Sequence, residues 1–141
     1  MNQNTRIILL IVLIGGLIGL GIGMYMFQKP HDNLSDLKAD YSLAATELFH
    51  EYETDETQAN QRYLDKVIQI EGTLAEISET GEGDAVLFLR PDDAMFGVSC
   101  AFSGADAQRA LALSEGSSLS IKGVCTGMNL DVNLVRCVIS P

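Results

Sequence analysis

The order of apolar and polar positions divides the chain into an apolar N-terminal stretch and a mixed remainder. Residues Ile7 to Phe27 form 21 consecutive uncharged positions that are rich in isoleucine and leucine. As a helix rising about 1.5 Å per residue, this stretch spans roughly 30 Å, the thickness of a bilayer core. The pattern predicts a transmembrane anchor over 7–27, preceded by a short cytoplasmic tail at 1–6.

A cleaved signal peptide is the alternative interpretation of this stretch, with a small-residue cleavage site at 21–23. Its apolar region exceeds the ~7–15 residues that are usual in signal peptides, which favours an uncleaved anchor. The positive-inside rule is nearly balanced, because Arg6 flanks one side and Lys29 and Lys38 the other. Since an N-terminal anchor of this kind exports the chain on its C-terminal side, we expect a single-pass inner-membrane protein with a cytoplasmic N-terminus and a periplasmic, or otherwise extracytoplasmic, C-terminal domain.

Polar residues dominate from 28 to 41, which predicts a tether without a fold of its own. A helical period begins at Ser42, a cap candidate, and places four apolar side chains near one face: Leu43, Leu48, Phe49 and Tyr52. Asp55 and Gln58 have the spacing of a capping box, which predicts a second short helix that ends near Tyr63.

The apolar period changes to two after the second helix, which predicts strands. The first strand is long, starts at Val67 and contains Gly72 as a bulge or bend. The second covers 85–89, and the third covers 96–102. A helix at 105–113 follows, and strands at 119–125 and 132–139 complete the domain, which we place at 42–141. Val98, Cys100 and Phe102 share one face of the third strand, and Phe102 is expected in the core.

Five strands with a helix between the third and fourth is the order of an OB-fold, a mainly β, Greek-key barrel. Four segments carry a closer resemblance: YLDKVIQIEG at 63–72, VSCAF at 98–102, KGVCTG at 122–127 and DVNLVRC at 131–137. With them the stretch from Leu43 to Ile139 resembles the tRNA_anti-like family of bacterial membrane-attached or exported OB-fold proteins. The resemblance implies a five-stranded barrel behind two short helices and brings no known activity or binding residues.

The charge of the part after the anchor bears on possible ligands. All 19 acidic residues and eight of the nine basic residues follow Phe27, so this part carries a net charge of −11. Such a charge repels phosphate backbones, and the basic residues of the strand region are scattered. Its aromatic candidates for base stacking are Phe88, Phe96 and Phe102, and its basic ones are Lys66, Arg90, Lys122 and Arg136.

No converging set of catalytic or metal-binding residues is visible in the sequence. His31 falls in the tether and His50 on the first helix, and neither has an evident partner. Asp92 and Asp93 alone do not supply the six to eight oxygens of a calcium site. The three cysteines lack the short paired spacing of a structural zinc site. We expect no catalytic residues, no cofactor and no metal, and therefore no enzyme.

The cysteines are better candidates for a disulfide. Strand alternation places Cys125 and Cys137 on the inward faces of the last two strands, and a hairpin centred near Asp131 would set them opposite each other. This predicts a Cys125–Cys137 disulfide with Cys100 as a buried thiol. Because the third and fifth strands are neighbours in an OB barrel, Cys100–Cys137 is the main alternative, and three reduced thiols are another.

Two functions from different classes remain open. The first is a non-catalytic binding or scaffolding module of the cell envelope that contacts a protein, peptide or glycan. The alternative is a protein that binds single-stranded nucleic acid or tRNA, which the charge makes less favourable. A homo-oligomer through the anchor helix is a further possibility, since Gly15, Gly19 and Gly23 recur at four-residue spacing.

Overall fold

The computed structural model describes residues 2–27 and 34–141, which belong to two separate units. Helix α1 (Gln3–Phe27) makes up the first unit and begins four residues before the predicted anchor. Its side chains are exposed from Ile7 to Tyr25, and the helix is long and apolar enough to cross a membrane. A cleaved signal sequence meets the same criterion.

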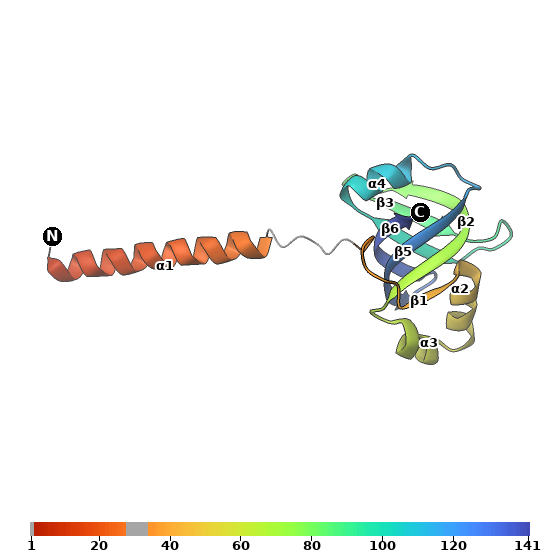
Figure 1. Ribbon diagram of the computed structural model, residues 1–141, viewed down its shortest axis with the longest axis horizontal. Helices are drawn as coiled ribbons and strands as arrows, with labels where there is room; N and C mark the ends of the chain where they lie inside the picture. Colours follow the sequence, from red (N-terminus) through yellow and green to blue (C-terminus); the bar gives the residue numbers. More distant parts are fainter. Residues whose placement is uncertain (1, 28–33) are drawn as a thin grey trace. The chain divides into compact units, whose positions relative to one another are not determined.

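Alternating apolar residues build the second unit around a closed barrel of five strands (Figure 1). The strands are β2 (Val67–Glu79), β3 (Ala85–Leu89), β4 (Val98–Phe102), β5 (Ser118–Met128) and β6 (Val132–Ser140). They pair in the order β2-β3-β4-β6-β5, and β5 pairs back with β2 to close the barrel. The β4–β6 pairing is parallel, and the other barrel pairings are antiparallel. This is the predicted OB-fold.

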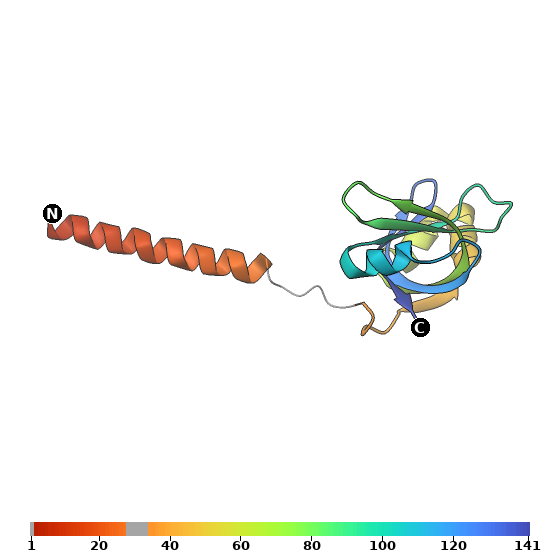
Figure 2. The ribbon, with the colours of Figure 1, turned by 90° about the horizontal axis from the view of Figure 1, so that it is seen from above.

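Inward-facing residues of all five strands form one core. The predicted inward face of the third strand is confirmed, because Val98, Cys100 and Phe102 are fully buried. Two helix groups cover opposite ends of the barrel (Figures 1 and 2). Helix α4 (Gly104–Leu111) covers one end through buried alanines, and α2 (Ala45–Thr54) with α3 (Glu56–Tyr63) covers the other.

Asp55 caps the second helix as predicted, whereas the predicted start of the first helix is wrong. The Asp55 carboxylate accepts a hydrogen bond of 3.0 Å from the Gln58 backbone N–H and so caps α3. Residues 41–44, however, form strand β1 (Tyr41–Ala44), which pairs in parallel with β2. Ser42 is therefore no cap, and α2 begins at Ala45.

Asp40 explains this difference. Its backbone N–H donates to the Val67 carbonyl at 2.8 Å, and its carboxylate accepts from the Val67 N–H at 3.0 Å. This pair of bonds starts the β1–β2 ladder, so the backbone groups of 41–44 find partners in the sheet instead of in a helix.

The irregularity in the long strand lies beyond the predicted position. The register of β2 against β3 shifts between Leu74 and Glu76, not at Gly72. Gly72 instead allows close packing, because a Cβ there would lie 3.0 Å from the Ala45 Cβ and 3.0 Å from the Leu89 Cδ2. The missing side chain brings the start of α2 onto the barrel.

The predicted tether is partly folded. Residues 28–33 lie outside the described residues, but residues 34–40, which we call the strap, pack on the barrel. Leu34 is 3% exposed, and the Lys122 ammonium donates to the carbonyls of Leu37 at 2.7 Å and Ser35 at 3.4 Å. Lys122 projects from the outer face of β5, so its burial requires these acceptors. The strap supplies them and belongs to the domain.

Candidate ligand-binding surface

Alternation along the strands places a row of polar and aromatic side chains on the outside of the barrel. Glu76 of β2 pairs with Phe88, Phe88 pairs with Ser99 of β4, and Ser99 pairs with Asn133 of β6. The residues next to them in β3 and β4 point into the core. With Arg90, which directly follows β3, these residues form what we call the β3–β4 face.

A planar stacking surface occupies one part of the β3–β4 face. The guanidinium carbon of Arg90 lies 5.7 Å from the centroid of the Phe88 ring, and Arg90 Nη2 forms an ion pair of 2.8 Å with Glu76 Oε2. The carboxylate holds the guanidinium near the ring, which is a cation–π arrangement. This part offers an aromatic ring and a delocalised cation whose charge already has a partner.

A hydrogen-bonding pair occupies the other part of the face. Ser99 Oγ donates to Asn133 Oδ1 at 2.7 Å, and Ser99 is buried. Because the Asn133 carbonyl oxygen accepts this bond, its side chain presents amide N–H donors on the outer surface. The β3–β4 face therefore joins a stacking surface to hydrogen-bond donors.

Three loops border the face. The turn at 80–84 lies at one end, where β2 leads into β3, and the loops at 90–97 and 129–131 lie at the other. The latter two are joined, because the Gly97 N–H donates to Asp131 Oδ1 at 2.8 Å and its carbonyl accepts from Val132 at 3.0 Å. They carry two exposed apolar side chains, Met95 at 78% and Leu130 at 65% exposure.

The charge on and beside the β3–β4 face is predominantly negative. Arg90 is the one basic residue in 67–97, the stretch that contains β2, β3 and the loops at 80–84 and 90–97. Seven carboxylates lie in the same stretch: Glu71, Glu76, Glu79, Glu82, Asp84, Asp92 and Asp93. Such a field attracts cations and repels polyphosphates. The face is therefore suited to a ligand that is basic or uncharged.

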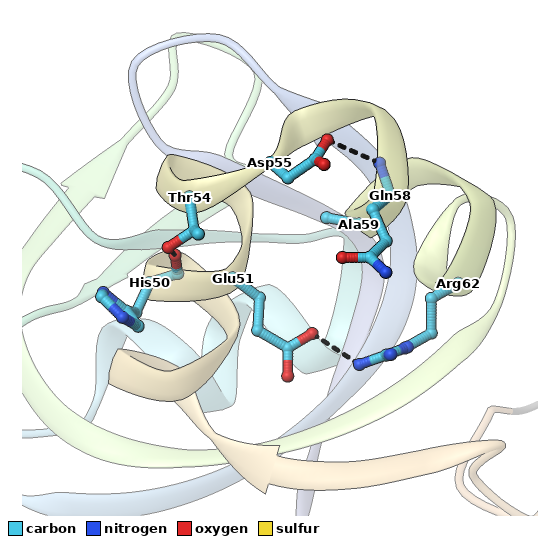
Figure 3. Close-up of a pocket in the computed structure, with 7 residues that line it drawn as sticks. All are labelled: His50, Glu51, Thr54, Asp55, Gln58, Ala59 and Arg62. Atoms are coloured by element: carbon cyan, nitrogen blue, oxygen red, sulfur yellow. Dashed lines mark hydrogen bonds and ion pairs between the residues drawn. The ribbon is translucent and has the colours of Figure 1, made fainter.

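A second feature, a polar hollow between α2 and α3, has a volume of about 220 Å³ (Figure 3). It is lined by His50, Glu51, Thr54, Asp55, Gln58, Ala59 and Arg62. Glu51 Oε2 forms an ion pair of 3.0 Å with Arg62 and accepts a bond of 2.8 Å from the Tyr63 hydroxyl. Burial raises the pKa of Tyr63, so its hydroxyl stays protonated and donating. These contacts hold α2 against α3, so we interpret the hollow as part of the packing between the two helices.

Among the residues that the structure describes, those weighed for catalysis and metal binding do not come together. His50 lines the hollow and is exposed. Thr54 Oγ1 donates a hydrogen bond of 2.8 Å to the backbone carbonyl of His50. His31 lies outside the described residues. Within residues 2–27 and 34–141, no three His, Cys, Asp or Glu side chains are grouped to hold a metal ion.

All three cysteines are buried free thiols, and the hairpin register that favoured a Cys125–Cys137 bond is wrong. Cys125 pairs with Leu134, and its Sγ lies 3.3 Å from the Tyr52 hydroxyl. The connection between β5 and β6 is three residues long and sets Met128 opposite Val132, and two register shifts occur further along the pair. Cys125 and Cys137 therefore do not stand opposite each other.

Comparison with known proteins agrees with this architecture. The barrel makes the protein an OB-fold protein, and the tRNA_anti-like family model matches residues 1–139. The chain belongs to the tRNA_anti-like family, as its sequence segments predicted. No curated protein matches the chain.

Among solved structures, the chain is similar to a "putative nucleic acid-binding lipoprotein" from Klebsiella pneumoniae, with 16% identity and a TM-score of 0.61. The match covers 81% of this chain and 100% of the other. The chain also matches the aspartyl-tRNA synthetase of Entamoeba histolytica, with 12% identity and a TM-score of 0.44. That match covers 73% of this chain and 25% of the synthetase.

Proposed function

We propose that the protein is a non-catalytic binding module of the bacterial cell envelope that binds a basic peptide segment of a partner protein on its β3–β4 face. The observation that carries this proposal is the acidic border of a face that already holds Phe88 stacked with Arg90. In OB-folds this face and the loops beside it are the usual place for ligands.

The chemistry of the face favours a peptide over a phosphate polymer. A lysine or arginine side chain of the ligand would find carboxylates in the loops at 80–84 and 90–93. An apolar or aromatic side chain would find Phe88 at the centre and Met95 and Leu130 at the border. The amide of Asn133 would bond a backbone carbonyl. Each group on the face then has a counterpart in an extended peptide.

The proposed location in the envelope is supported by α1 and by the description of the Klebsiella relative as a lipoprotein. In this proposal α1 remains uncleaved, and the barrel lies outside the cytoplasm. Protease added to spheroplasts should then remove the barrel and leave a membrane fragment containing α1. A protected domain would reverse the topology, and a soluble periplasmic form beginning near Met24 would show that α1 is cleaved.

A photoreactive amino acid placed at Phe88 tests the binding face in living cells. Crosslinks to a defined envelope protein are expected from position 88. The matched control is position 108, an exposed glutamine on α4 at one end of the barrel. Equal crosslinking from both positions, or none from position 88, would contradict the assignment of the face.

Single-stranded nucleic acid is the second candidate ligand. It is favoured by the description of the Klebsiella relative and by the Phe88–Arg90 pair, since a ring with a nearby guanidinium also stacks on bases. The charge of the surrounding loops opposes it. Oligonucleotide binding by the whole chain separates the two candidates.

A further inference from the structure

Within residues 34–141, the large apolar side chains that are exposed fall into two groups. Met95 and Leu130 border the β3–β4 face. The other three are Leu37 in the strap, Tyr41 at the start of β1 and Leu64, which directly follows α3. Their exposed fractions are 42%, 37% and 39%. Single exposed apolar residues are ordinary on a protein surface, but a group of them indicates a contact.

Contacts between the strap, β1 and α3 bring the second group to one corner of the domain (Figure 1). The Tyr41 ring packs edge-on against the Tyr63 ring, with the ring centroids 5.0 Å apart, and Leu64 is the next residue. The backbone N–H of Asp40 donates to the first residue of β2 at 2.8 Å, which fixes the chain just before Tyr41. Four residues span at most about 14 Å, so Leu37 lies within that distance of Tyr41.

This corner, which we define as residues 34–41 and 62–66 and call the strap corner, has no net charge. Its three basic residues, Lys38, Arg62 and Lys66, balance three carboxylates, and all three basic residues are exposed. The rest of the part after α1 therefore carries the whole net charge of −11. An anionic surface repels that remainder but not the strap corner.

The chain also enters the barrel unit at the strap corner. Six residues, 28–33, separate α1 from Leu34 in the sequence, so even a fully extended chain places Leu34 at most about 25 Å from the end of α1. A domain of about 100 residues has a radius of gyration of about 13 Å and is therefore more than about 30 Å across. When α1 spans a bilayer, the strap corner is thus held near the lipid surface.

We propose that the strap corner docks the barrel unit on the lipid surface of the membrane that α1 spans. Leu37, Tyr41 and Leu64 insert between the headgroups, and the ammonium groups of Lys38 and Lys66 contact lipid phosphates. Tyrosine suits this depth, because its ring is apolar and its hydroxyl is polar. The proposal rests on the part of the proposed function that keeps α1 uncleaved in the membrane, and it does not involve the β3–β4 face.

The contact depends on α1 for its strength. Three partly exposed side chains bury too little apolar surface to hold a free protein on a bilayer. The anchor, however, makes docking an intramolecular step, for which the effective concentration of the lipid surface is in the millimolar range. A weak affinity is then sufficient to orient the domain. The β3–β4 face stays available for its ligand, because the strap corner shares no residue with it.

Single tryptophan residues test the docking, because the chain contains no tryptophan of its own. The full chain, with α1 confirmed by mass spectrometry, is reconstituted as one chain per nanodisc in a mixture of zwitterionic and anionic phospholipids. Leu64→Trp and Leu37→Trp should lose fluorescence when lipids with brominated acyl chains replace the ordinary ones. Gln108→Trp is the control and should keep its fluorescence, because residue 108 is exposed on α4 at the other end of the barrel.

Two results would overturn the proposal. The first is fluorescence that brominated lipids leave unchanged at positions 64 and 37, or quench equally at position 108. The second is a blue-shifted but unquenched emission from position 64 that appears only with two chains per disc, because a second copy of the chain would then cover the strap corner.

Charge reversal tests the contribution of the lysines. In the Leu64→Trp chain, Lys66→Glu should reduce the quenching, because it gives the strap corner a net charge of −2 beside anionic lipids. Arg109→Glu changes the net charge of the domain by the same amount, on α4, and should leave the quenching unchanged. Equal effects of the two variants would contradict docking through the strap corner.

The docking can fail separately from the proposed function. Because the discs contain the full chain, the quenching does not depend on whether α1 is cleaved in cells or on which side of the membrane the domain lies. Phe88→Ala should leave the quenching of Leu64→Trp unchanged. Unquenched fluorescence together with specific crosslinking from position 88 would overturn the docking alone. Quenching in discs together with a cleaved α1 in cells would contradict the anchored location instead.

Discussion

At the scale of single residues, contacts between particular atoms determine details of the core packing that apolar character alone does not predict. Gly123 is an example, because it gives space to a sulfur from the next strand that no periodicity in the sequence predicts. Tyr52 is another example. Its ring was expected to pack on the domain, but its buried hydroxyl also needs a hydrogen-bond partner, which is Cys125. Side-chain alternation predicts which way residues point, and it does not predict which strand they meet.

Gly123→Ala should destabilise the domain by about 1–3 kcal/mol, because the new methyl group would overlap Cys137 Sγ and press on the Leu134 Cβ at 3.1 Å. Urea unfolding measures the change. Gly81→Ala is the matched control, since a Cβ there meets nothing within 4 Å. Adding Cys137→Ala to Gly123→Ala should recover part of the loss. Equal stabilities of the two alanine variants would contradict the packing described for Gly123.

Tyr52 should make the stability depend on alkaline pH. Burial raises its pKa, and the hydrogen bond with Cys125 raises it further. Below its unfolded pKa of about 10, Tyr52 is neutral in both states and the free energy of unfolding does not respond to it. Above that pH the unfolded chain loses the proton first, so stability falls as pH rises, by at most about 1.4 kcal/mol per pH unit.

Tyr52→Phe removes the hydroxyl and therefore its contribution to the dependence of stability on pH. Urea unfolding between pH 9 and 11 should show a shallower decline for the variant than for the wild type. Tyr41→Phe, at a more exposed ring, serves as the control and should decline as the wild type does. An identical decline for Tyr52→Phe and the wild type would show that the hydroxyl is not buried in the way described.

At the scale of elements, periodicity predicted the five barrel strands, α3 with its cap and α4, because these elements depend on local patterns of apolar residues. It missed β1 and the strap, which form through contacts with residues far along the chain: Asp40 with Val67, and residues 35 and 37 with Lys122. The β3–β4 face was partly accessible from sequence. Phe88 and Arg90 are two positions apart at the end of a strand, so alternation alone places them on one side.

Lys122→Met should loosen the strap. Loss of the ammonium leaves the carbonyls of Ser35 and Leu37 without their charged donor, a contact typically worth about 1.5–3 kcal/mol. Local opening should therefore rise on the order of tenfold or more, and trypsin should cleave after Lys38 correspondingly faster in the full chain in micelles. Lys66→Met, at an exposed lysine, is the control. An unchanged cleavage rate in Lys122→Met would mean that the strap does not depend on this contact.

At the scale of the whole molecule, the fold and the charge favour different ligands. The OB-fold and the family to which the chain belongs are associated with nucleic-acid recognition in their names, and the Phe88–Arg90 pair resembles a base-stacking platform. The part after α1, however, carries a net charge of −11, and its acids border the face that would bind. Because phosphate contacts dominate affinity for nucleic acids, charge should decide. A shared fold alone does not define a ligand.

The full chain in zwitterionic micelles should therefore fail to bind a fluorescent oligothymidine with submicromolar affinity at physiological salt, as measured by anisotropy. Any residual binding should be unaffected by Phe88→Ala, since it would not involve the ring. Glu82→Lys with Asp84→Lys is an informative control. It changes the charge of the turn beside the face by four units and should strengthen oligonucleotide binding and its dependence on salt. A submicromolar dissociation constant for the wild type that Phe88→Ala weakens would instead make the β3–β4 face a nucleic-acid site and overturn the peptide-binding proposal.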